Sequence, residues 1–262
     1  MTSTQPTQAP TQIDLPYPTS QDNQLWITVG ACRLTVRPGA GDKWVSGTYS
    51  DPTGALPYRI AQEDTRTRIT QEHLWPVHWG SGHRPPVFDL ALGTSRPFAL
   101  TLESGASEAH LDLGGLPLTR LIARLGAGKF NLDFSMPNPQ LMTVLDVSSG
   151  AGSMDVHNLA NANCPEIVLN GGAAAYTFDF GGTLQRETHV RISTGLSSVS
   201  IAIPSQTAAT ITSESFLGSI EVGDGFTKQG GAYLTPQAIK GSTPLLRIAT
   251  SVALGAVCLR LM

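Results

Sequence analysis

The first group in this sequence with the chemistry to hold a metal is a run of histidines in one short stretch. The stretch contains His73, His78 and His83, interleaved with Trp75 and Trp79. Imidazole nitrogens are common ligands of zinc and copper, so metal binding is one hypothesis for this stretch. Pro76 interrupts any helix there, and no cysteine or carboxylate lies within the group. These features favour a packed loop, or a loop that contacts a partner or ligand, over a metal site.

A second candidate group is acidic and recurs at one position of a repeated phrase. It comprises Asp112, Asp133, His157 and Asp179. Stacked carboxylates bind cations or act as paired acid and base groups, for example on a carbohydrate. The alternative is structural, because an outward position on a strand is normally polar and an aspartate at a strand end bonds the adjacent turn. Both interpretations stay open at this point.

The phrase that carries this acidic column repeats about every 22 residues. A Gly–Ala or Gly–Leu pair is followed by small or polar residues and then by alternating apolar residues. Copies begin at Gly105, Gly126, Gly150, Gly172 and Gly195, and a degenerate copy begins at Phe216. A repeat of this length is typical of a solenoid, in which each repeat packs on its neighbours.

The alternation within the phrase predicts which side chains face the interior. Side chains four residues after the first glycine share one face, and those six residues after it share the same face. These positions hold Ala109, Phe130, Met154, Tyr176 and Val199, and then Leu111, Leu132, Val156, Phe178 and Ile201. Stacked successively, they form apolar columns, and the glycines allow a tight corner in every rung. The sequence therefore predicts an all-β parallel solenoid with about two strands per rung.

Three regions follow from this pattern. Residues 1–24 are rich in Thr, Gln and Pro and are expected to be a disordered tail. Residues 25–104 are expected to form N-terminal strands that cap or extend the solenoid. Residues 105–262 form the repetitive part, in which 223–244 is an insertion or cap and 251–261 returns to the repeat frame with Val257 and Leu259 inward.

Composition excludes several classes of function. The net charge of −3 provides no basic field, so nucleic acid is not an expected partner. No secretory signal is visible, and the apolar segment 245–262 is interrupted by Arg247, Gly255 and Arg260, so no membrane span is expected. The three widely spaced cysteines predict neither disulfides nor a metal site. On these grounds we expect a cytoplasmic protein without a cofactor.

The phrases LGAG, SGAGS and GGAAAYTFDFGG resemble those of toast-rack β-solenoid domains. These bacterial domains are related to the C-terminal domains of LiaF-type cell-envelope stress proteins, and the resemblance covers residues 25–262. It implies a link to the envelope or to a stress response, with an envelope-associated location as the alternative to the cytoplasm. It carries over no catalytic residue.

The function expected from all of this is a non-enzymatic scaffold that binds a protein partner or associates with itself. Solenoids offer long faces and sheet ends that suit such contacts. Two alternatives remain. One is a carbohydrate-binding or carbohydrate-active β-helix that uses the acidic column, and the other is a metal-binding protein that uses the histidine stretch.

Overall fold

The computed structural model describes residues 9–39, 42–54, 56–71 and 84–262. The candidate residues His73, Trp75, His78, Trp79 and His83 lie outside these ranges. The elements are β1 (Thr11–Pro16), β2 (Asn23–Pro38), β3 (Lys43–Ser50), β4 (Tyr58–Gln62), β5 (Arg66–Gln71), β6 (Val87–Leu92), β7 (Phe98–Asp112), β8 (Leu118–Asp133), β9 (Val144–His157), the 3-10 helix η1 (Leu159–Ala162), β10 (Glu166–Asp179), β11 (Thr188–Ile203), β12 (Ala208–Val222), β13 (Thr227–Gln229), β14 (Ala232–Leu234), α1 (Pro236–Ile239) and β15 (Leu245–Leu261).

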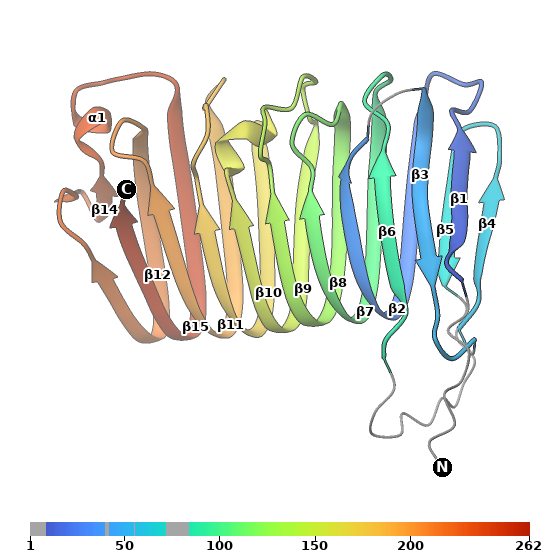
Figure 1. Cartoon of the computed structure of the whole chain (residues 1–262). Helices are drawn as coiled ribbons and strands as arrows, with labels where there is room; N and C mark the ends of the chain where they lie inside the picture. The colour runs from blue at the N-terminus through green and yellow to red at the C-terminus, as the bar shows by residue number, and fades with distance from the viewer. Residues whose placement is uncertain (1–8, 40–41, 55, 72–83) are drawn as a thin grey trace, which may run out of the picture.

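The protein is an all-β solenoid, as the repeat predicts, and Figure 1 shows its long strands standing side by side like the wires of a rack. Each long strand runs down, bends at a glycine corner and runs up again. The two strand-like runs of a rung are therefore one continuous strand, such as β8. We call the part before the corner the first arm and the part after it the second arm. The arms form two layers that enclose the core.

The parallel register places the predicted apolar columns in this core. Phe130 pairs with Ala109 on one side and Met154 on the other, and Tyr176 pairs with Met154 and Val199. Each of these five side chains is at most 2% exposed. The prediction of inward positions is confirmed, because the two-residue period of a strand is preserved on each side of the corner.

The order of the rungs differs from the order of the chain at the C-terminal end. Strand β15 lies between β11 and β12 and is parallel to both. The last run keeps the repeat frame, with Val257 and Leu259 fully buried, but it is inserted as the second-to-last rung. Segment 223–244 makes this return possible: its hairpin of β13 and β14 and the short α1 cover part of β12.

At the N-terminal end the sheet branches at β2, and the two branches extend the two layers. The first arm of β2 pairs with β5, which pairs with β4, whereas the second arm of β2 pairs with β6, which continues to β3 and β1. Trp44, fully buried in β3, stacks on Tyr17 and contacts the edge of Phe98. These N-terminal strands therefore close one end of the core.

The prediction that residues 1–24 form a disordered tail is wrong for residues 11–16. Strand β1 pairs antiparallel with β3, and its Ile13 is only 3% exposed. The Thr, Gln and Pro content concealed a short alternation of Ile13, Leu15 and Tyr17. All three side chains pack into or against the core.

Candidate functional site

The acidic column lies at the C-terminal ends of β7 to β10, away from the glycine corners. Asp112 accepts hydrogen bonds from the Gly114 amide (2.9 Å) and the Ser135 hydroxyl (2.7 Å). Asp133 accepts one from the Asn158 side-chain amide at 2.8 Å. The bond from the Gly114 amide to Asp112 has the geometry of an Asx turn, whereas the bonds from Ser135 and Asn158 come from the loop after the neighbouring rung.

The last two members of the column, His157 and Asp179, lie next to each other. Asp179 accepts from the Gly181 amide at 2.6 Å and lies 3.8 Å from Nδ1 of His157, measured from Oδ2. The structure thus places all four predicted column residues at successive strand ends. Within the described ranges, no group of three or more His, Cys, Asp or Glu side chains is arranged to hold a metal ion.

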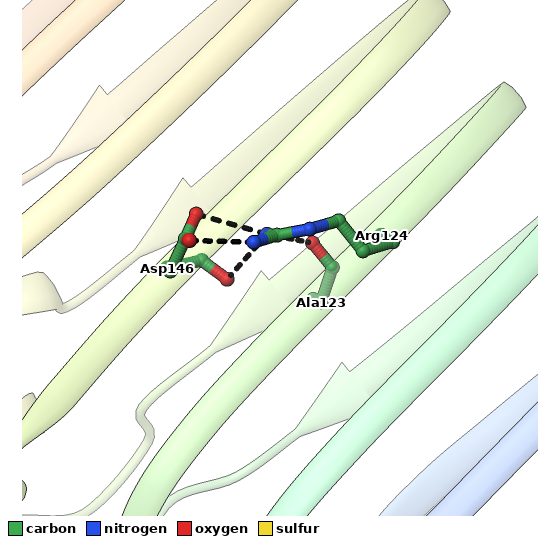
Figure 2. Close-up of polar contacts among 3 residues, drawn as sticks. All are labelled: Ala123, Arg124 and Asp146. Atoms are coloured by element: carbon green, nitrogen blue, oxygen red, sulfur yellow. Dashed lines mark hydrogen bonds and ion pairs between the residues drawn. The ribbon is translucent and has the colours of Figure 1, made fainter.

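An ion pair with two hydrogen bonds joins neighbouring rungs on the outer face of the first arms. Arg124 of β8 donates to both carboxylate oxygens of Asp146 in β9, at 2.9 and 2.6 Å (Figure 2). These hydrogen bonds raise the pKa of the Arg124 guanidinium above its ordinary value. Both side chains are partly exposed, and pairs of this kind contribute at most about 1 kcal/mol to stability. The pair joins neighbouring rungs and leaves no free group for chemistry.

The thiols provide no reactive nucleophile in the core. Burial raises the pKa of Cys32 to about 12 and that of Cys164 to about 11. Both are free thiols, and Cys258 is free and only partly buried. Since the thiolate is the reactive form, the two buried cysteines are protected both by their pKa and by the surrounding core.

We expect iodoacetamide at pH 8 to alkylate Cys258 in the folded protein and to leave Cys32 and Cys164 unmodified. The reason is that the two buried thiols are at most 3% exposed and hold their protons at this pH. Peptide mass spectrometry measures the modification, and alkylation of all three cysteines in urea serves as the control. Alkylation of Cys32 in the folded state at the rate of Cys258 would contradict the packing described above.

The surface that departs most from the repeat lies at the corners of the last three rungs. The second position of the corner phrase holds alanine from Ala106 to Ala173 and leucine in the rungs that follow. Strand register stacks Leu196 on Leu254 and Leu254 on Leu217. Their exposed fractions are 59%, 44% and 60%, and the adjacent Phe216 is 86% exposed. We call these four residues the leucine ridge.

A shallow hollow of about 820 Å³ lies against this ridge. Its lining contains Ala, Ser, Gly and Leu side chains and no charged group. The residues are Ala173, Ala174, Leu196, Ser197, Ser198, Leu217, Gly218, Ser219, Leu254, Gly255 and Ala256. Contiguous exposed apolar surface beside an uncharged hollow is typical of a site of protein association.

This surface is not among the candidate sites predicted from the sequence, although the sequence carries a signal for it. The copy that begins at Gly195 carries leucine where four earlier copies carry alanine. Within the sequence, this replacement of alanine by leucine looks like ordinary variation between copies of a repeat. Only the register shows that the three leucines lie side by side and that no other described segment covers them.

Comparison with known proteins identifies the family. Residues 3–157, more than half of the chain, match the model of the N-terminal domain of toast_rack, DUF2154. The chain belongs to the toast-rack family. This assignment confirms the resemblance seen in the Gly–Ala phrases. No curated protein matches the toast-rack chain.

Two solved structures are similar to this chain at low sequence identity. A "putative cell adhesion protein" from Clostridium sporogenes is 15% identical, with a TM-score of 0.50, and the match covers 97% of this chain and 100% of that one. A "putative adhesin" from Bacteroides fragilis is 9% identical, with a TM-score of 0.36, and the match covers 98% and 100%. The first of these supports the fold. In the described ranges, no helix has the length and apolar character needed to cross a membrane.

Proposed function

We propose that this toast-rack protein is a non-enzymatic scaffold that binds another protein through the leucine ridge and its adjacent hollow. The observation that carries the proposal is the stacking of Leu196, Leu254 and Leu217 into one exposed apolar surface. Burying a leucine side chain that is about half exposed contributes roughly 1 kcal/mol, so a ridge of this size supplies a useful share of a binding energy. In the earlier rungs, the same corner position holds alanine, so those rungs offer no comparable exposed apolar surface.

The rigid rack explains how such a surface is presented. Corner residues of neighbouring rungs are held by continuous parallel pairing, so the ridge loses little conformational freedom when a partner binds. The similar protein from Clostridium sporogenes carries the name of a cell adhesion protein. Together with the family's relation to envelope stress proteins, this supports a role in contacts at the bacterial envelope.

Site-specific photo-crosslinking tests the proposal. A photo-reactive phenylalanine analogue replaces Leu217 in one protein and Ala127, an exposed residue of the same corner column, in a matched control. In extract from cells that naturally make the protein, we expect a discrete protein adduct at position 217 only. Unmodified protein should compete for it, whereas a Leu217→Ser, Leu254→Ser variant should not. Equal adducts at both positions, or none at 217, would contradict the proposal.

A further inference from the structure

The outermost rung at the C-terminal end has an edge that is only partly paired. Strand β12 pairs with β15 along its whole length, but on its other side it pairs with β14 at Thr210 and Ile211 alone. From Thr212 to Val222, no described segment pairs with that side of β12. Unpaired backbone groups along a strand of this length form a template for another strand.

The core is also uncovered along the second arm of this rung. Ile220 and Val222 continue the two apolar columns beyond Val257 and Leu259. Val257 and Leu259 are fully buried, whereas Val222 is 37% exposed and Ile220 is half-buried. A further strand placed on β12 would bury the ends of both columns and complete the packing that every inner rung has.

The charge at this edge restricts what such a strand can be. Glu214, Glu221 and Asp224 are exposed, and none of them forms an ion pair with another described residue. Three unpaired carboxylates along β12 and directly after it disfavour an anionic membrane surface. They favour a partner with positive charge.

The same charges disfavour a second copy of β12 as the occupant. Suppose that the β12 edges of two copies paired antiparallel with their corners aligned. The inward-facing Ser213 of one copy would then lie opposite the inward-facing Val222 of the other. This register places Glu214 of each copy opposite Glu221 of the other. Like charges directly opposite each other destabilise a strand pair.

We infer that the partner at this end is an extended protein segment that adds to the free edge of β12, with basic residues flanking apolar ones. The inference rests on the proposed function and names the chemistry of its partner. The apolar residues of the segment cover Ile220, Val222 and the outer end of the leucine ridge at Phe216 and Leu217, while its lysine or arginine side chains pair with Glu214 and Glu221. Strand addition of this kind derives its affinity from the backbone and its specificity from alternate side chains.

Two synthetic peptides test this inference by fluorescence anisotropy. Both alternate valine and threonine over ten residues, and one carries lysine at each end whereas the other carries glutamate. At low ionic strength, we expect the intact protein to bind the lysine peptide at least tenfold more tightly than the glutamate peptide. We expect the Glu214→Lys, Glu221→Lys variant to reverse that preference. Equal affinities, or no binding of the lysine peptide, would overturn the inference.

Further measurements separate this inference from the proposed function. Hydrogen exchange should show slower exchange of the Ser219–Val222 amides when the lysine peptide is bound. Asp155 lies in the same outward column as Glu221 but at an inner rung, so Asp155→Lys should leave the preference for the lysine peptide unchanged. A stable dimer of the wild-type protein in light scattering would overturn the inference in favour of a second copy. If the Glu214→Lys, Glu221→Lys variant still formed the crosslink at position 217, the leucine ridge would remain a binding surface. The inference that a strand adds to the edge of β12 would then be refuted.

Discussion

Replacing Gly152 with alanine is expected to lower the free energy of unfolding by about 3 kcal/mol. Gly152 has a φ of 118°, a conformation that residues with a Cβ rarely adopt. An added Cβ would lie 1.9 Å from the carbonyl oxygen of Gly128 in the neighbouring rung. Because that oxygen belongs to the backbone of a paired strand, relief requires the rungs to separate locally. Urea unfolding followed by circular dichroism measures the loss.

Gly195→Ala is the matched control at another corner. There an added Cβ would lie 3.4 Å from the Gly172 carbonyl oxygen, which is an ordinary contact. The change should therefore alter the free energy of unfolding by less than about 1 kcal/mol, because the contact adds little strain and alanine restricts the unfolded chain. If the two variants had the same stability, close approach at the corners would not explain the glycines.

The second large effect is expected in the core. Phe178→Ala should cost about 3–5 kcal/mol, the usual range for removing a buried aromatic ring. Phe178 is 1% exposed, stacks beside Tyr176 at a centroid distance of 6.0 Å, and lies in one column between Val156 and Ile201. Strands fixed by pairing on both sides cannot move together to fill the vacated space. The free energy of unfolding in urea again measures the loss.

Phe216→Ala provides a control with the same chemical change. Phe216 is 86% exposed at the corner of β12, so its removal should change stability by less than about 0.5 kcal/mol. The same variant should weaken the crosslink at position 217, because the ring belongs to the leucine ridge. A large loss of stability from Phe216→Ala would place this side chain in the core and remove it from the binding surface.

Most of the rung architecture was predictable from the sequence because it depends on local spacing. Alternating residues such as Phe130 and Leu132 face one side of a strand wherever that strand pairs. Glycines at regular intervals mark the corners because a Cβ there would approach the neighbouring rung too closely, as at Gly126 and Gly172, where it would lie 2.3 and 2.2 Å from a backbone oxygen. These features need no knowledge of which rungs are neighbours.

The candidate site was less predictable because its residues acquire meaning through their neighbours. The acidic column was visible, yet the bonds of Asp112 to Gly114 and Ser135 depend on how the following loops fold. The second corner position is exposed in inner rungs as well, for example at Ala127. What the sequence does not give is the pairing that places Leu254 between Leu196 and Leu217 and so joins three leucines into one ridge.

The sequence by itself determined the β-solenoid, its repeat length of about 22 residues and the inward columns, because the two-residue period of a strand and the small size of glycine act locally. Only the tertiary structure decided that β15 inserts before β12, that β1 joins the N-terminal end, and that Thr212–Val222 keeps an unpaired edge. The physical reason is that strands of the same repeat are nearly interchangeable in their pairing. The selection among them comes from contacts between segments far apart in the chain, such as the return of segment 223–244 over the end of the rack.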